Sequence, residues 1–329
     1  MPGGMRILVT GSAGHLGEAL MRRLPEDGHE VIGLDMIASP HTDVVGSIAD
    51  RACVQRAVKD TDAVVHTATL HKPHVGTHTR ADFVSTNIAG TLNLLEGAVA
   101  ASVSRFIFTS TTSAFGRANT PAPGEPAAWI TEEVAPIPRN IYGATKVAAE
   151  DLCELISRDH GLPCLILRTS RFFPDPDDRV EVRTTYQDPN IKVNELLSRR
   201  VDIEDVVSAH TLALARAPLL GFGRYIISAT SPFTPADLAA IRTDLPSVVR
   251  RLYPDFDDVY SVRGWRMFDA IERVYVNERA RTDLGWAPRY DFRHALDRLA
   301  AHADPFSPLV RTIGRKGYHE VSTGVYTVR

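Results

Sequence analysis

Short apolar runs alternate with longer stretches of helical periodicity through the first two-thirds of the chain. The strand-like runs are Ile7–Thr10, Val31–Leu34, Ala63–His66, Phe106–Ser110 and Cys164–Arg168. The helical patterns lie near His15–Leu24, Arg51–Lys59, Arg80–Ala101 and Ile141–His160. Unbroken apolar strands separated by helices are typical of a parallel sheet that is covered on both faces. We therefore expect an α/β protein with a doubly wound parallel sheet, which binds ligands at the carboxyl ends of its strands.

The pattern loosens after Arg168. Residues 174–200 are rich in Pro, Asp and Arg, and a helical pattern follows at Asp202–Ala217, then a short strand at Arg224–Ser228. A further helix is expected to start near Pro235 with Thr234 as its N-cap. Residues 303–329 contain two prolines and three glycines and are expected to form an irregular tail. We expect a nucleotide-binding part at residues 1–170 and a smaller substrate-binding part at residues 171–329, interleaved with the sheet.

Composition narrows the class of protein. The chain has 329 residues, 44% hydrophobic and 23% charged, with a formal net charge of −3, so nothing favours binding to nucleic acid or anionic membranes. Its three cysteines are widely spaced and odd in number, which suits a reducing compartment better than a disulfide framework. No apolar stretch reaches membrane-spanning length, and the first strand follows the N-terminus closely. We expect a cytoplasmic protein.

The first apolar run leads into a glycine-rich turn at Gly11, Gly14 and Gly17, which opens the first helix. N–H groups at a helix start have no partner inside the helix and favour an anion, and glycine lets a pyrophosphate approach the backbone. Asp35 ends the second strand eighteen residues after Gly17, close to the spacing of a carboxylate that binds an adenosine ribose. The context favours a Rossmann-type dinucleotide site over a glycine-rich surface turn.

A second group of residues carries candidate chemistry. Tyr142 and Lys146 are four residues apart, so they share one face of a helix. An ammonium beside the phenol would lower the tyrosine pKa from about 10 toward the working range, and the phenolate could then take a proton from a substrate hydroxyl. Thr111 follows the fourth run and could orient the substrate oxygen. The alternative is a Tyr–Lys pair on a helix surface without a catalytic role. The nucleotide-binding half that precedes the pair favours the catalytic interpretation.

Together these motifs resemble the extended short-chain dehydrogenases/reductases of the sugar-nucleotide epimerase and dehydratase group. The resemblance covers roughly residues 5–300. It includes the glycine turn, Asp35, His66-Thr67-Ala68, the helix around Asn87, the strand and turn Thr109–Gly116, Tyr142 with Lys146, Arg200–Val207, and Leu284-Gly285-Trp286-Ala287-Pro288.

The resemblance implies roles for individual residues. Tyr142 would be the acid/base, Lys146 would tune its pKa and contact the nicotinamide ribose, and Thr111 would orient the hydroxyl. The implied cofactor is NAD rather than NADP, because the Asp35 carboxylate repels a 2′-phosphate. The cofactor-binding residues would be Gly11, Ala13, Gly14, His15, Leu16, Gly17, Asp35, Ser47, Ile48, Thr67, Ala68, Asn87, Tyr142 and Lys146. The family often pairs through the helices near Arg80–Ala101 and Ile141–His160, which implies a homodimer.

The chain departs from the family pattern in four places. Thr112 and Ser113 stand where dehydratases have Asp-Glu, so sugar dehydration is rejected. Ser47 replaces an acid beside Gly46. Arg171 stands where sugar-nucleotide enzymes usually have Asn, and could clamp an anion or pair with Asp175, Asp177 or Asp178. The segment between Pro174 and Arg200 is short for wrapping a nucleotide, which makes a smaller hydroxylated substrate plausible, as in the related uronate dehydrogenases.

Other polar clusters have simpler interpretations. Three histidines lie in the loop His71–His78; no carboxylate or cysteine joins them at ligand spacing, so a flexible lip over the active site is favoured over a metal site. Asp202, Glu204 and Asp205 are interpreted as a solvated helix start. The candidate substrate-binding residues are His71, Thr112, Ser113 and Arg171, and no metal is expected.

The sequence thus predicts an NAD-dependent oxidoreductase acting on a hydroxyl carbon of a sugar-type substrate. An epimerase of a sugar or sugar nucleotide is favoured. A simple sugar or sugar-acid dehydrogenase is the first alternative, and a non-catalytic NAD-binding regulatory protein is an alternative of another class.

Overall fold

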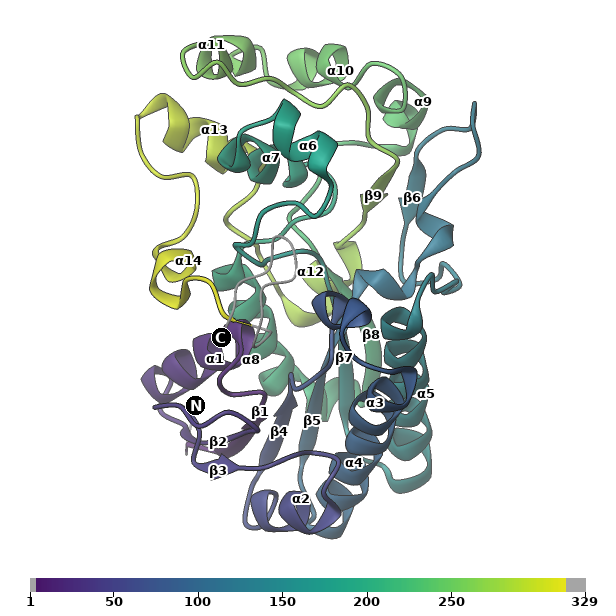
Figure 1. Cartoon of the computed structure of the whole chain (residues 1–329), viewed down its shortest axis with the longest axis vertical. Helices are drawn as coiled ribbons and strands as arrows, with labels where there is room; N and C mark the ends of the chain where they lie inside the picture. The colour runs from purple at the N-terminus through teal and green to yellow at the C-terminus, as the bar shows by residue number, and fades with distance from the viewer. Residues whose placement is uncertain (1–3, 318–329) are drawn as a thin grey trace.

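A computed structural model describes residues 4–317 of the chain. Seven parallel strands form the central sheet, in the order β3-β2-β1-β4-β5-β7-β8 (Figure 1). They are β1 (Arg6–Thr10), β2 (Glu30–Asp35), β3 (Val44–Val45), β4 (Ala63–His66), β5 (Arg105–Thr111), β7 (Cys164–Thr169) and β8 (Phe222–Ile227). The order runs outward from β1 in both directions, so β1 and β4 flank the switch point where such sheets bind ligands. The predicted doubly wound fold is confirmed.

Helices cover both faces of the sheet, and each face has its own apolar core. One face carries α1 (His15–Glu26), α8 (Ile203–Leu220), α12 (Glu278–Leu284) and α14 (Pro308–Ile313). The other carries α2 (Arg51–Ala57), α4 (Gly90–Ala100) and α5 (Ile141–His160). The five predicted strands agree with the structure to within two residues at each end, and the bounds of α5 match its predicted range. β8 and α8 come from the predicted substrate-binding part and complete the sheet and one helical layer; the division at residue 170 remains a prediction.

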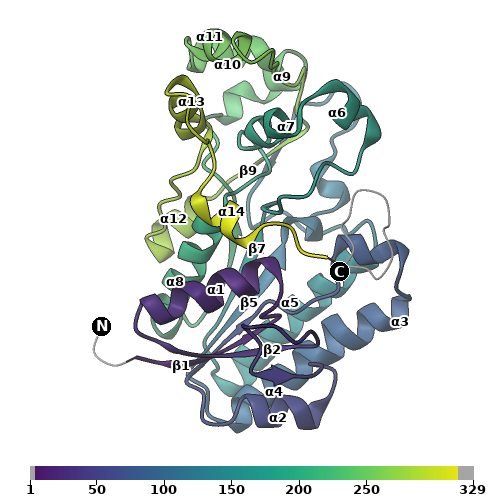
Figure 2. The same cartoon turned by 60° about the vertical axis from the view of Figure 1, so that its left-hand side comes forward.

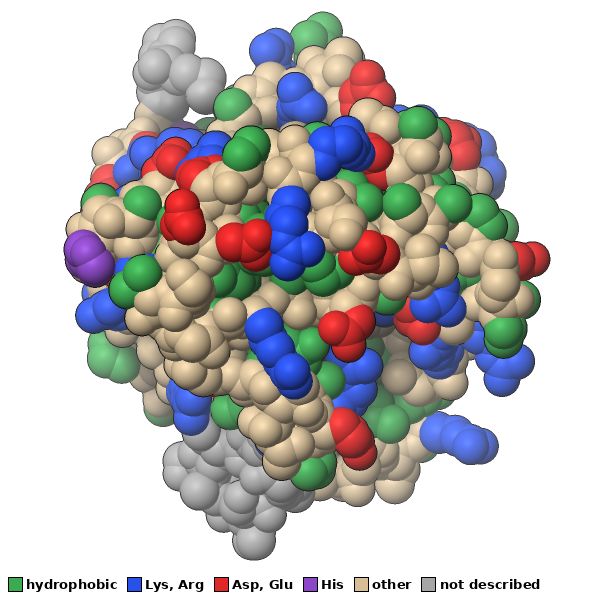
Figure 3. Space-filling model, turned by 90° about the horizontal axis from the view of Figure 1, so that it is seen from above, with side chains coloured by type: hydrophobic (Ala, Val, Ile, Leu, Met, Phe, Trp, Pro, Cys, Tyr) green, Lys and Arg blue, Asp and Glu red, His purple; other side chains and the backbone are tan. Residues whose placement is uncertain are grey.

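A third core lies beyond the carboxyl ends of the strands. Figure 1 shows it at the top of the molecule, above the sheet. It is built from α7 (Asp188–Glu195), α9 (Leu238–Ile241), α10 (Leu245–Leu252), α11 (Phe256–Ser261), α13 (Phe292–Ala300) and the strand pair β6 (Ala128–Ile130) and β9 (Arg273–Tyr275). The 3-10 turn η5 (Pro235–Asp237) precedes α9, at the predicted start after Thr234. On the outer end of this part, acidic and basic side chains are interspersed (Figure 3), as in the Arg250–Asp257 and Arg251–Asp237 ion pairs.

A segment without a clear pattern and the tail that was expected to be irregular both contain helices. The Pro/Asp/Arg-rich residues 174–200 form α6 (Val180–Thr185) and α7. In the predicted tail, residues 308–313 form α14, which packs on α1 and α8 (Figure 2). The prediction of irregular structure is therefore wrong for these residues. Pro308 occupies the first turn of α14, where proline is favoured because its missing N–H would be unpaired anyway. Residues 318–329 of the expected tail lie outside the described residues.

The acidic cluster at the start of α8 also differs from the expectation. Asp202 is buried as the N-cap and accepts hydrogen bonds from the Glu204 and Ser307 backbone N–H groups, at 2.9 and 3.0 Å. Asp205 is buried and accepts bonds from the N–H groups of Arg289 and Tyr290, both at 2.9 Å. The solvated interpretation is wrong for these two carboxylates, because they anchor late segments of the chain to α8.

The predicted helix at Arg80–Ala101 is continuous but not uniform. It comprises α3 (Arg80–Phe83), the π-helical segment η2 (Val84–Ala89) and α4. Such π segments inside helices are frequent at functional sites. Among residues 4–317, no helix is long and apolar enough to cross a membrane.

Candidate active site

The glycine turn between β1 and α1 has three distinct geometries. Gly11 has φ +73°, and a Cβ there would come within 2.8 Å of the Ala68 nitrogen. A Cβ on Gly17 would lie 1.9 Å from the Gly11 carbonyl oxygen, so glycine is needed for the close packing of α1 on the turn. A Cβ on Gly14 would meet only that same oxygen, at 3.2 Å. The position is otherwise open, as a cradle for a pyrophosphate at a helix N-terminus requires.

Other predicted cofactor residues surround this cradle. Asp35 Oδ2 accepts a hydrogen bond from the Ala13 N–H, at 3.0 Å. Thr67 donates from its hydroxyl to the Thr10 carbonyl at 2.7 Å, which fixes the loop after β4 against the end of β1. Ser47 accepts a bond from the Ala49 N–H at 3.1 Å. The residues present therefore fit a dinucleotide.

Ile48 and Asn87 hold the cradle side of the fold together. Ile48 is buried, and a Cβ on Gly90 of α4 would approach its side chain to 2.7 Å, so the two elements pack closely. The buried Asn87 amide, on η2, donates to the Leu70 carbonyl and the Thr145 hydroxyl and accepts from the Leu70 N–H. Asn87 thus joins the loop after β4 to the helix that carries Tyr142.

His15 and Leu16 are buried at the start of α1. His15 Nε2 accepts a hydrogen bond of 3.2 Å from the Lys316 N–H, and its ring meets the Phe173 ring edge-on at 5.2 Å. Burial lowers the pKa of His15 to about 3, so the ring is neutral at physiological pH. The segment around Lys316 therefore neighbours the cofactor cradle, and no sequence pattern predicts this contact.

The three candidate catalytic residues come together at the carboxyl end of β5. Thr111 ends β5, and α5 begins at Ile141 after its N-cap Asn140, which accepts a hydrogen bond from the Gly143 N–H at 3.0 Å. Tyr142 is only 8% exposed. Burial raises the pKa of its phenol to about 12, and a hydrogen bond with the Thr111 side chain acts in the opposite direction. The structure thus brings Thr111 and Tyr142 to one cavity, and their catalytic roles remain predictions.

Lys146 is buried one turn further along α5. Its ammonium donates a hydrogen bond of 2.7 Å to the Thr109 carbonyl oxygen and lies 3.8 Å from the centre of the Phe108 ring. Burial lowers the pKa of Lys146 to about 7, while the Glu150 carboxylate raises it. The expectation that Lys146 lowers the Tyr142 pKa does not hold in this structure, because desolvation of the phenol dominates and the ammonium is directed to Thr109.

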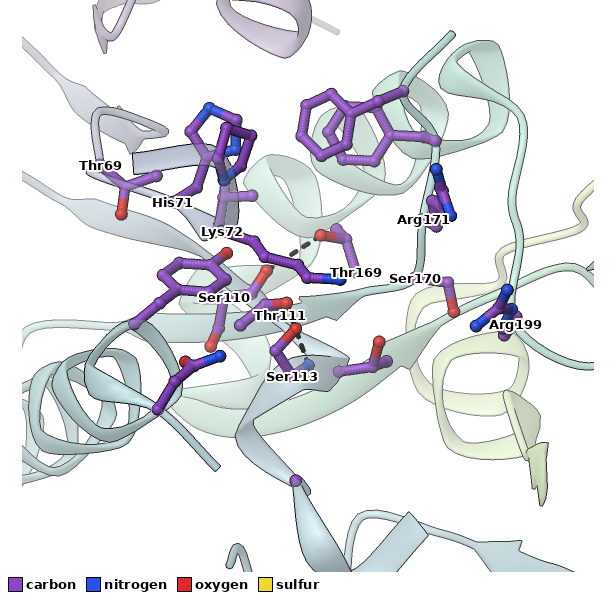
Figure 4. Close-up of a pocket in the computed structure, with 18 of the residues that line it drawn as sticks. Thr69, His71, Lys72, Ser110, Thr111, Ser113, Thr169, Ser170, Arg171 and Arg199 are labelled. Atoms are coloured by element: carbon purple, nitrogen blue, oxygen red, sulfur yellow. Dashed lines mark hydrogen bonds between the residues drawn. The ribbon is translucent and has the colours of Figure 1, made fainter. Parts of the chain in front are cut away.

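A cavity of about 400 Å³ opens beside Tyr142. Hydroxyl side chains dominate the part of its wall drawn in Figure 4. They belong to Thr69, Thr109, Ser110, Thr111, Thr112, Ser113, Thr169 and Ser170. All four predicted substrate residues, His71, Thr112, Ser113 and Arg171, line the cavity.

Of the two interpretations of Arg171, an anion clamp or an ion pair with a nearby aspartate, the structure shows the ion pair. Its guanidinium binds Asp177 at 2.9 Å and lies 3.6 Å from Glu195. The histidine loop forms a 3-10 turn, η1 (Lys72–Gly76), and its N-cap His71 stacks on Phe173 with 5.4 Å between the ring centres. Over residues 4–317, no group of three or more His, Cys, Asp and Glu side chains is arranged to hold a metal ion.

Sequence reasoning missed several residues of the cavity wall, namely Asn119, Arg139, Ser170, Arg199, Arg273 and Tyr275. Ser170 and Arg199 adjoin segments that carried the resemblance, so their neighbourhood was a usable signal. Asn119, Arg273 and Tyr275 lie in segments without a motif, and the latter two lie on β9, which pairs with β6.

Comparison with known proteins identifies the family. The model of the NAD dependent epimerase/dehydratase family matches residues 7–221. The low-salt glycan biosynthesis protein Agl12 of Haloferax volcanii is 33% identical over 184 aligned residues. These residues make up 51% of this chain and 57% of Agl12. A UDP-glucose 4-epimerase of Azospirillum brasilense is 25% identical, over 95% of each chain. Among solved structures, the fold is similar to that of a short-chain dehydrogenase/reductase superfamily protein of Agrobacterium tumefaciens, which was solved with bound NAD. The two chains are 24% identical and superpose with a TM-score of 0.64, over 90% of this chain and 96% of the other.

Proposed function

The chain belongs to the NAD dependent epimerase/dehydratase family, and from this premise we propose that it is an NAD-dependent epimerase of a sugar or sugar nucleotide. The observation that carries the proposal is the position of Tyr142. Its phenol lies with Thr111 in the wall of a cavity that is lined by hydroxyl side chains. Hydroxyl groups that both donate and accept suit a ligand that carries several hydroxyls of its own.

The cradle and its surroundings would hold the cofactor. Gly11, Gly14 and Gly17 would hold the pyrophosphate, and Asp35 the adenosine ribose. NAD, when bound, supplies the nicotinamide ring that accepts a hydride from the substrate carbon and returns it. Lys146 would contact the nicotinamide ribose, as the family resemblance implies.

Tyr142 would carry out the proton transfer. The phenolate oxygen takes the proton of the substrate hydroxyl while the carbon is oxidised to a ketone, and Thr111 orients that hydroxyl. In an epimerase, the ketone then turns its other face, and the Tyr142 hydroxyl returns a proton to the same oxygen. The high pKa of Tyr142 means that this cycle needs a positive charge near the phenol. For Lys146, one turn away on α5, to supply it, the ammonium would have to leave the Thr109 carbonyl and turn toward the phenol.

We further infer a cytoplasmic homodimer. Val84 on η2 and Leu155 on α5 are exposed apolar side chains on the two elements through which the family pairs. Light scattering of the purified protein tests this. A mass near twice the 36.1 kDa of the chain is expected, and a monomer at micromolar concentration would contradict it.

The reaction type is tested by incubating the purified protein with NAD and a panel of sugars, sugar acids and nucleotide sugars. Absorbance at the NADH band and proton NMR of the sugar are recorded together. An epimerase interconverts two isomers without a net rise in NADH. NADH formed in proportion to substrate would instead identify a dehydrogenase. NAD binding without turnover of any probe would favour a regulatory protein.

A further inference from the structure

One end of the active-site cavity holds polar groups that the proposed reaction does not use. β9 brings Arg273 and Tyr275 to this end, and the turn η4 (Arg117–Asn119) brings Asn119. The cradle-side residue His15 lines the same cavity from α1, beyond Tyr142. In Figure 4, Thr69 and His71 lie on one side of Thr111, while Ser170 and Arg199 lie on the other.

Arg273 is the feature of this end that most needs an explanation. Its side chain is only 18% exposed, and the nearest carboxylate oxygen, on Glu272, is 3.7 Å away. Its guanidinium makes no hydrogen bond to any residue in the described part of the chain. The positive charges of Arg199 and Arg139 add to the burial that lowers its pKa. A cation that is mostly out of water, beside other cations and without an acceptor, is costly unless an anion joins it.

The neighbouring guanidiniums already have their acceptors. Asp177 pairs with Arg171 and Arg199, and with Arg179 at 3.5 Å. Glu195 pairs with Arg199 at 2.7 Å and, through Oε2, with Arg200 at 2.8 Å. Two buried carboxylates therefore serve four guanidiniums. The carboxylates of this cluster therefore do not serve Arg273, whose nearest carboxylate oxygen among residues 4–317 is that of Glu272 at 3.7 Å.

Three uncharged groups beside the cavity complete a receptor. Asn119 donates from Nδ2 to the Tyr275 hydroxyl at 3.0 Å, which leaves the hydrogen of that hydroxyl free to be donated. Asn119 Oδ1 and Ser170 Oγ are buried and have no hydrogen-bond partner among residues 4–317. Unpartnered buried polar atoms in a cavity wall indicate a ligand that supplies the missing partners.

The acidic side chains that line the cavity already have cations beside them. Asp178 pairs with Lys72 of η1, and Asp175 interacts with Arg315, the residue next to the Lys316 that binds His15. These two carboxylates therefore leave the positive charge of Arg273 unbalanced.

We propose that Arg273 anchors an anion subsite, so that the substrate is a hydroxylated molecule with a carboxylate or phosphate group at the end remote from the cofactor. Arg273 binds that group, Tyr275 donates to it, and Asn119 Oδ1 and Ser170 accept from neighbouring substrate hydroxyls. This inference rests on the proposed function and narrows its substrate class. Guanidinium binds both carboxylate and phosphate in a bidentate manner, so the two sources share one chemistry.

The test measures binding to the NAD-saturated protein by calorimetry at low salt. The probes are D-glucose, D-glucuronate, glucose 6-phosphate and UDP-glucose, which separate a neutral sugar, a carboxylate, a phosphate and a nucleotide diphosphate. The variant is Arg273→Met, which keeps most of the side-chain volume. Arg250→Met is the matched control, because it removes the same charge from an exposed ion pair with Asp257 on α11.

At least one anionic probe should bind ten times more tightly than D-glucose. Arg273→Met should remove that advantage, a loss of at least tenfold or about 1.4 kcal/mol. The same variant should leave D-glucose binding, NAD affinity and melting temperature unchanged. Arg273→Lys keeps the charge without the bidentate guanidinium. Its affinity for the anionic probe should lie between those of the wild type and Arg273→Met.

The subsite and the proposed function fail in different ways. If D-glucose binds as tightly as every anionic probe, or if Arg273→Met binds the preferred anion like the wild type, the subsite is wrong while the function stands. If none of the probes binds or is turned over, the proposed function is wrong as well.

Discussion

The Asp35 carboxylate accepts a hydrogen bond from the main-chain N–H of Ala13, with 3.0 Å between Oδ2 and the nitrogen. Its other oxygen accepts from the Ile37 N–H at 2.9 Å. The end of β2 is thereby fixed to the glycine turn, and both bonds hold the negative charge in one place. A ribose 2′-hydroxyl can donate to this carboxylate, whereas a 2′-phosphate would be repelled by it.

Replacing Asp35 with alanine should weaken NAD binding at least tenfold, because a hydrogen bond to a charged group contributes about 1.5–3 kcal/mol. NADP binding should weaken less, so the preference for NAD should narrow. Titration of cofactor fluorescence measures both affinities, with Asp159→Ala, on the exposed C-terminal end of α5, as the control. Tighter binding of NADP than NAD by the wild type would refute the role of Asp35.

Alanine at Gly14 and alanine at Gly17 should have opposite effects on folding and binding. The added Cβ at position 14 meets one oxygen at 3.2 Å, so Gly14→Ala should fold, yet its methyl group occupies the space a pyrophosphate needs. NAD affinity should fall at least tenfold with a melting temperature within a few degrees of the wild type.

The Gly17→Ala protein should instead lose stability, because its Cβ would lie 1.9 Å from the Gly11 carbonyl oxygen and backbone must move. We expect a loss of about 3 kcal/mol or more, at the upper end of overpacking effects. Thermal unfolding of both variants checks this. A stable Gly17→Ala protein, or Gly14→Ala with wild-type NAD affinity, would contradict the account of the turn.

Glu150 holds the buried face of α5 against the sheet. It accepts a hydrogen bond of 2.5 Å from the Ser110 hydroxyl and binds Arg168 through both of its oxygens, at 2.7 Å for the shortest contact. Glu150→Gln would leave the Arg168 charge buried without its carboxylate, which should cost about 3–5 kcal/mol in the free energy of unfolding. Urea unfolding measures the loss, with the more exposed Glu154→Gln as the control. Equal stabilities would show that the pair contributes nothing.

His210 should make stability depend on pH. Its Nε2 accepts from the Thr109 hydroxyl at 2.8 Å and its Nδ1 donates to the Val206 carbonyl, and burial lowers its pKa from 6.5 to about 4. Between these two pKa values the unfolded chain binds more protons than the folded chain, so the free energy of unfolding falls as pH falls. The loss from pH 7 to pH 5 is about 2 kcal/mol for this one group.

His210→Gln should abolish that part of the pH dependence. Its free energy of unfolding should change about 2 kcal/mol less than that of the wild type between pH 7 and pH 5. Urea unfolding at the two pH values measures the difference, and His302→Gln, at an exposed position, controls for loss of a histidine. Parallel pH profiles for wild type and His210→Gln would show that His210 titrates normally.

The sequence predicted the sheet well because its strands are buried and its ligand site lies where the strand order reverses. The glycine turn, Asp35, Thr111 and Tyr142 were found because each follows a strand or begins a helix at a recognisable position. Local pattern did not reveal contacts made by distant residues. The burial of Asp202 depends on Ser307, 105 positions later, and that of Asp205 on Arg289.

The same limit applied to the site. Arg273 and Tyr275 lie on a three-residue strand whose pairing with β6 carries no sequence signature. The effect of Lys146 on Tyr142 was expected from spacing alone, but burial decides both pKa values. By contrast, α14 could have been predicted, since Ser307-Pro308 is a recognisable helix start.

The most direct test of the central claim, that Tyr142 transfers the substrate proton, is the turnover number of Tyr142→Phe with the substrate found in the screen. Tyr290→Phe, which removes a hydroxyl bonded to Glu204 at the surface, is the control. We predict at least a hundredfold lower turnover for Tyr142→Phe, in line with the loss of a general base, with NAD affinity within a few-fold of the wild type. Wild-type turnover in Tyr142→Phe would contradict the account.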